Sequence, residues 1–147
     1  MAKSRFTLQS VLLIRERERD VARRQMGQAI ALIEQIEAEL RAGEEARAVC
    51  SVELGQLMAQ RTINIEAVNI RRYHLGRLDI EILGVKSRLQ AGREILEKCR
   101  QLLVLADQKV KAIEQIREKR ELEALHEAIQ IESREQEEAW QAGQGSP

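Results

Sequence analysis

The residues of this sequence that could do chemistry stand in no arrangement that a reaction or a metal ion would need. His74 and His126 are far apart, and Cys50 and Cys99 lack the C-x-x-C spacing of a metal or redox site. No glycine-rich loop is followed by Lys and Ser or Thr, as nucleotide binding through a P-loop requires. The glutamate pairs are typical of solvated helix surfaces, which offer no water-excluded cleft for acid–base catalysis. We therefore expect no catalytic residue, no cofactor and no metal, and a protein that is not an enzyme but acts through its partners.

The composition is that of long helices. Of 147 residues, 33% are charged and 44% hydrophobic, but only 2% are aromatic, and Pro147 is the single proline. Turn dipeptides and strand-like alternating runs are missing, which favours an all-α fold. The 24 basic and 24 acidic residues cancel, so the charge indicates no attraction to nucleic acid. No apolar run approaches the ~20 residues that span a bilayer, and the isolated cysteines fit a cytoplasmic protein without direct membrane insertion.

Apolar residues recur at alternating steps of three and four in two long segments. We call these two stripes the first and the second seam. The first seam consists of Ala22, Met26, Ala29, Ile33, Ile36, Leu40, Gly43, Arg47, Cys50, Leu54 and Leu57, and only Gly43 and Arg47 depart from its apolar pattern. The second seam consists of Leu75, Leu78, Ile82, Val85, Leu89, Gly92, Leu96, Cys99, Leu103, Ala106, Val110 and Ile113. A sustained 3.5-residue repeat places one narrow apolar stripe on a helix, and this stripe must pack against a partner stripe.

The stretch between the two seams predicts a turn, because it combines polar seam positions with β-branched residues and two asparagines. Asn64 is suited to cap a new helix, with Glu66 at its positive end. We expect a single coiled-coil domain over residues 1–147, and within it a long antiparallel two-helix hairpin. Its parts would be helix one over about 7–61, a turn at about 62–64, helix two over about 65–139 and a flexible tail over 141–147. One unbroken helix in a parallel homodimeric scaffold is the alternative, since the heptad register does not slip across the gap.

Folding back near residue 63 would pair positions whose numbers add up to about 126, and helix two would overhang. The overhang carries its own apolar residues, Leu122, Leu125 and Ile129. Residues 1–27 hold seven basic and three acidic residues, whereas 114–139 hold four basic and nine acidic ones. In a hairpin both segments lie toward the open end, which is either a solvated surface or a docking surface for a protein partner.

Two places could anchor a partner. Tyr73, His74, Leu75 and Leu78 cluster just after the turn. Either the leucines close the seam and Tyr73 shields it, or the group forms an exposed patch of the kind that aromatic residues anchor. Trp140 follows the last regular heptad and is either frayed or an anchor at the overhanging end.

Both ends of the sequence resemble the flagellar type III export stalk and general chaperone family, FliJ. The stretch RFTLQSVLLIRERERDVARRQMGQA is similar to the N-terminal pattern of that family, which has an aromatic residue, a leucine two residues on, then a Val-Leu pair and an Arg/Glu-rich helix with alanine on the seam. The stretches KAIEQIREKRELEAL and SREQEEAW are similar to its C-terminal pattern. The residues that carry the first likeness are Phe6, Leu8, Val11, Leu12, Arg15 and Ala22.

The resemblance implies a non-enzymatic stalk of the flagellar protein export apparatus, at the cytoplasmic face of the inner membrane. Such a stalk would insert in the hexameric flagellar export ATPase ring, contact the cytoplasmic domain of the export gate protein and assist export chaperones. It implies a gate surface on early helix two: Tyr73, His74, Leu78, Glu81 and Val85. For the ATPase, it implies the open end: Phe6, Arg15, Arg19, Arg23, Leu125, Ile129 and Trp140. A stalk of an injectisome-type secretion system is the alternative within the same class.

Overall fold

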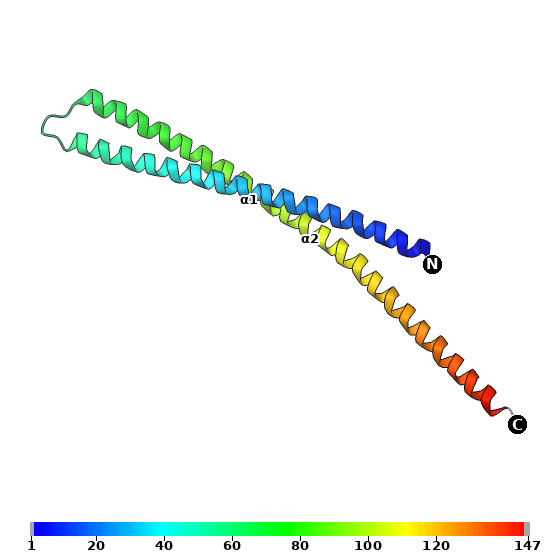
Figure 1. The fold of residues 1–147 in the computed structure, drawn as a ribbon. Helices are drawn as coiled ribbons and strands as arrows, with labels where there is room; N and C mark the ends of the chain where they lie inside the picture. Colours follow the sequence, from blue (N-terminus) through cyan, green and yellow to red (C-terminus); the bar gives the residue numbers. More distant parts are fainter. Residues whose placement is uncertain (1, 146–147) are drawn as a thin grey trace. The chain divides into compact units, whose positions relative to one another are not determined.

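The computed structural model describes the backbone of residues 2–145 and the side chains of residues 7–145. Within these residues the chain forms two helices and no strand: α1 over Ala2–Met58 and α2 over Ile65–Gln144 (Figure 1). The predicted all-α helical hairpin is therefore confirmed. The alternative of one unbroken helix is wrong, because the chain leaves the helical conformation between Met58 and Ile65.

The turn forms where the sequence predicts it, and its capping residue is the expected one. The Asn64 side-chain oxygen accepts a hydrogen bond from the backbone N–H of Ala67 at 3.2 Å. The Asn64 carbonyl accepts one from Val68 at 3.1 Å. The Asn64 side chain thus satisfies one of the donors that a helix N-terminus leaves open, and the Asn64 carbonyl accepts the first hydrogen bond within α2. Glu66 lies in the first turn of this helix.

The outer ends of both helices differ from the expected bounds. α1 begins at Ala2 rather than near residue 7 and ends at Met58 rather than at residue 61. α2 runs to Gln144 and includes four residues that we expected in a flexible tail. At the two outer ends the cause is helix propagation, which adds one hydrogen bond for each residue fixed and continues until a breaker intervenes. The expected single domain over residues 1–147 stays a prediction.

The chain divides into two compact units. The turn-proximal unit comprises Val21–Leu103 and therefore contains the turn with the adjoining arm of each helix. The terminal unit comprises the described residues up to Asp20 and from Val104 onward. In Figure 1 the two arms of the turn-proximal unit lie side by side and are joined by the loop at one end.

The core of the turn-proximal unit is the pair of seams that the sequence predicts. Ile33, Ile36 and Leu89 form its buried cluster, against which Leu40, Val85 and Leu96 pack. The arms meet in the predicted register. A Cβ atom added at Gly43 would lie 3.3 Å from Ile82 Cγ1, and one added at Gly92 would lie 3.4 Å from Ile33 Cγ1.

Ion pairs along the edges of the seam support the same antiparallel register. Arg47 pairs with Asp79, and Arg88 pairs with Glu39. Arg71 pairs with Glu53 at 2.8 Å. The buried Cys50 thiol donates to the backbone carbonyl of Arg71 at 3.6 Å, and both Cys50 and Cys99 are free. Because the partners are partly exposed, these pairs set the register more than they add stability.

The terminal unit has a short core of its own, made by Leu12, Ala106 and Val110, of which Val110 is fully buried. Beside this core, Arg19 Nη1 lies 4.0 Å from Asp107, which also pairs with Lys111 at 3.1 Å. Every described residue after Glu114 is exposed. None of the helices, over the residues that the structure describes, has a stretch long and apolar enough to cross a membrane.

Candidate protein-interaction surfaces

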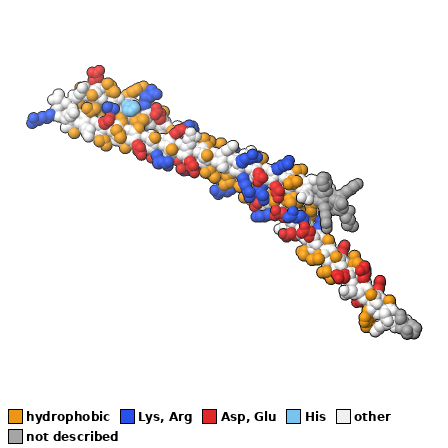
Figure 2. Space-filling model, viewed as in Figure 1, with side chains coloured by type: hydrophobic (Ala, Val, Ile, Leu, Met, Phe, Trp, Pro, Cys, Tyr) orange, Lys and Arg blue, Asp and Glu red, His pale blue; other side chains and the backbone are white. Residues whose placement is uncertain are grey.

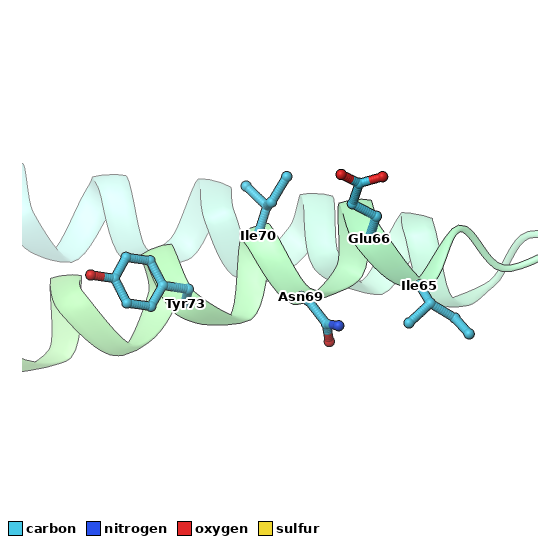
Figure 3. Close-up of a pocket in the computed structure, with 5 residues that line it drawn as sticks. All are labelled: Ile65, Glu66, Asn69, Ile70 and Tyr73. Carbon is cyan, nitrogen blue, oxygen red and sulfur yellow. The ribbon is translucent and has the colours of Figure 1, made fainter.

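The described residues hold no group of three or more His, Cys, Asp or Glu side chains that could bind a metal ion. A shallow depression beside the turn is lined by Ile65, Glu66, Asn69, Ile70 and Tyr73, which all belong to α2. Glu66 and Ile70 project from one side of this helix and Ile65 and Asn69 from the other, so the residues do not converge on an enclosed space (Figure 3). The depression is an open surface, which suits contact with another protein better than it suits binding of a small molecule.

Large apolar side chains cover the outer surface of α2 near the turn. Tyr73 is 69% exposed and Ile80 is 70% exposed, and Leu83 lies three residues further on the same side. Between and beside them, Gly76 and Gly84 have open space around the position of a Cβ atom. We call Tyr73, Gly76, Ile80, Leu83 and Gly84 the α2 outer face. Figure 2 shows hydrophobic side chains on the surface near the turn.

The residues predicted to bind the export gate do not all lie on one surface. Tyr73, His74 and Glu81 are exposed, whereas Leu78 is only 8% exposed and Val85 packs against the core cluster. Leu78 and Val85 therefore hold the two arms together, and a partner could reach them only if the seam opened. Both earlier interpretations of this region hold in part, since Leu78 closes the seam and Tyr73 is exposed.

The sequence analysis did not select Ile80 and Leu83. Their signal was present, because Ile80 lies seven residues and Leu83 ten residues after Tyr73, at spacings that share one face of a helix. Neither residue falls on the second seam, so the heptad pattern of that seam already placed both on the surface of α2 that faces away from α1.

A second apolar surface lies along one side of the turn-proximal unit, between its arms. Leu32, Ile36, Ala91 and Ile95 line a shallow groove there, and the Glu39–Arg88 ion pair borders it. Ile36 belongs to the core, whereas Leu32 and Ile95 are exposed. This groove is uncharged apart from that pair.

The residues predicted for the open end fall into two groups. Arg15 and Arg19 are half-buried; Arg15 pairs with Glu18 at 3.1 Å, and Arg19 lies near Asp107. The Nε atom of Arg19 is buried without a hydrogen-bond partner. These two arginines continue the first seam toward the N-terminus, which gives them a structural part in the terminal unit.

The other open-end residues are accessible. Arg23, Leu125, Ile129 and Trp140 are exposed. The side chain of Phe6 lies outside the described residues. The geometry thus offers three surfaces for a protein partner: the α2 outer face near the turn, the groove between the arms of the turn-proximal unit, and the exposed stretch of α2 beyond Glu114.

The geometry alone does not identify the protein family, but a comparison with models of known families does. The model described as "Flagellar FliJ protein" matches residues 4–142. Neither the curated proteins nor the solved structures gave a match to this chain.

Proposed function

We propose, because the chain belongs to the flagellar FliJ family, that it is a non-enzymatic stalk of the flagellar type III protein export apparatus. Membership of this family identifies a component related to flagellar protein export. The family description names the flagellum, which favours this system over an injectisome. The observation that carries the stalk proposal is the antiparallel packing of the two seams within one chain, which uses the heptad positions of both arms and leaves their outer surfaces for partners.

The proposed partner of the open end is the hexameric export ATPase. Two helices of different sequence present different side chains on every side, so a hairpin inside a six-fold ring contacts one subunit interface differently from the others. Such a stalk biases the states of the ATPase subunits only through its differential affinity for them. The accessible residues of the terminal unit for this contact are Leu125, Ile129 and Trp140, whereas the exposed Arg23 belongs to the turn-proximal unit.

The proposed partner of the turn-proximal unit is the cytoplasmic domain of the export gate. The α2 outer face, with His74 and Glu81 beside it, is the surface that we assign to this contact. Its exposed tyrosine, isoleucine and leucine supply apolar area, and its two glycines let a partner approach the backbone closely. Leu78 and Val85 keep a supporting role, because they fix α2 against α1.

We also propose that the protein assists export chaperones and works at the cytoplasmic face of the inner membrane, where the export apparatus would hold it. This part rests on the family alone. The balanced charge of the sequence supports protein partners over nucleic acid.

The decisive experiment is a coupled ATPase assay with the purified flagellar export ATPase of the same bacterium. We expect the protein to raise the rate of ATP hydrolysis and to co-elute with the ATPase, and to hydrolyse no ATP by itself. A variant with Tyr73→Ala and Leu83→Ala is the matched control, because it alters the surface assigned to the gate and should stimulate fully. Failure to stimulate and to co-elute would contradict the stalk, and hydrolysis by the protein alone would show that it is an enzyme.

A further inference from the structure

The last part of α2 carries an apolar face that no part of the described chain covers. Every residue from 115 to 145 is exposed, although the helix continues to Gln144. The large side chains of this stretch that are at least half exposed include Leu122, Leu125, Ile129 and Trp140. Folding of the two seams does not use these side chains, so their presence needs another explanation.

These four residues share one side of the helix. At about 3.6 residues per turn, Trp140 lies five turns after Leu122 and therefore directly above it. Leu125 and Ile129 follow at the i, i+3 and i+7 spacings of a coiled-coil seam. We call Leu122, Leu125, Ile129 and Trp140 the C-terminal apolar face. Ile131, which is also exposed, lies on the opposite side of the helix.

Glutamates border the C-terminal apolar face on both sides. By the same helical geometry, Glu121 and Glu132 lie along one edge, and Glu123 and Glu137 lie toward the other. Over residues 121–140 there are seven glutamates and one arginine, Arg134, which lies toward the back of the helix. Figure 2 shows acidic side chains among hydrophobic ones on this part of α2.

We propose that the C-terminal apolar face is the docking site for a basic amphipathic helix of a partner protein, which pairs with α2 as a coiled coil. Apolar residues of that helix would cover the four side chains, and lysines or arginines at its flanking positions would face the glutamates. The same face of a second copy is a poor occupant, because it would bring glutamates against glutamates. The inference deepens the proposed function, on which it rests, by naming the chemistry that the ATPase must present to Leu125, Ile129 and Trp140.

The test uses the full-length protein and synthetic helical peptides that contain no tryptophan. One peptide of about three heptads has leucine at the seam positions and lysine at the flanking positions, and its twin has glutamate in place of lysine. Trp140 is the only tryptophan, so a blue shift of its fluorescence reports docking on this face. We expect the lysine peptide to bind at least about ten-fold more tightly than its twin, with a preference that falls as salt is raised.

Two pairs of variants locate the binding site. Leu125→Gln with Ile129→Gln should weaken binding of the lysine peptide about ten-fold, whereas Ile131→Gln, on the opposite side, should leave it unchanged. Glu121→Lys with Glu132→Lys should remove the preference for the lysine peptide. Glu138→Lys, on the back of the same helix, should leave most of it. All of these positions are exposed, so the variants keep the fold.

The possible results separate clearly. Equal binding of both peptides, or binding that Leu125→Gln with Ile129→Gln does not weaken, overturns the inference. Light scattering of the protein alone would overturn it too if it found a dimer that these substitutions dissociate, because the occupant would then be a second copy. A protein that binds the lysine peptide as expected but fails to stimulate the export ATPase contradicts the proposed function instead and leaves the docking face standing.

Discussion

A glycine on the first seam and a glycine beside it show how single residues set the distance between the arms. A Cβ atom at Gly43 would lie 3.3 Å from Ile82, which is tighter than an ordinary contact, whereas Gly27 has nothing within 4 Å of that position. Glycine inside a helix costs about 1 kcal/mol relative to alanine, because the unfolded chain has more freedom to lose. The same substitution should therefore have different outcomes at the two sites.

We expect Gly27→Ala to raise the free energy of unfolding by about 1 kcal/mol. Gly43→Ala should gain clearly less, because Ile82 must move by a few tenths of an ångström to admit the methyl group. Urea unfolding followed by circular dichroism at 222 nm measures both. An equal gain at the two positions would show that the seam at Gly43 is looser than the contact with Ile82 indicates.

Replacing an isoleucine inside the seam should lower the stability of the protein much more than replacing one outside it. Ile36 is 5% exposed and belongs to the buried cluster, so Ile36→Ala removes packed methyl groups and should cost about 2 to 3 kcal/mol. Ile80→Ala, on the α2 outer face, should change stability by less than about 0.5 kcal/mol. Thermal unfolding of the two variants beside the parent protein tests this. A large loss on changing Ile80 would mean that its side chain is buried in solution.

At the scale of the helices, the sequence predicts most of the fold because its signals are local. The heptads specify both seams, and Asn64 specifies the start of α2. The outer ends of the helices escaped prediction, since no breaker marks them and propagation decides where they stop.

The candidate sites were less predictable for a different reason. The gate residues came from a resemblance, which groups residues by their place in the chain and not by the side of the helix they occupy. Leu78 and Val85 already stood on the second seam, and the structure places them there, whereas the exposed Ile80 and Leu83 stood off it. The heptad register was thus the better guide to the exposed surface.

The antiparallel register of α1 and α2 can be tested through one ion pair. Arg88 pairs with Glu39 across the arms, so Glu39→Arg or Arg88→Glu alone places like charges together and should cost roughly 0.5 to 1 kcal/mol. Both substitutions together restore an opposite pair and should recover most of that loss. Urea unfolding of the four proteins gives the coupling energy. If the loss of stability in the double variant equals the sum of the two single losses, Glu39 and Arg88 do not interact across the arms.

At the scale of the whole molecule, the packing of the two seams against each other makes a second copy unnecessary for folding. A parallel pair would need each seam to face its own counterpart, whereas the contacts of Ile82 with Gly43 and of Ile33 with Gly92 join different arms of one chain. Self-pairing of the C-terminal apolar face is opposed by its glutamates. The apolar side chains on the surface are then left for other proteins.

We therefore expect a monomer of 16.8 kDa by light scattering at micromolar concentration. The midpoint of thermal unfolding should not depend on protein concentration, because mass action stabilises only a folded state that needs a second copy. Ile36→Ala is the useful control: it should lower that midpoint at every concentration by the same amount, since it weakens packing within one chain. A mass near twice the monomer value, with a midpoint that rises on concentration, would show that the exposed apolar residues pair between copies and would leave no free surface for the ATPase and the gate.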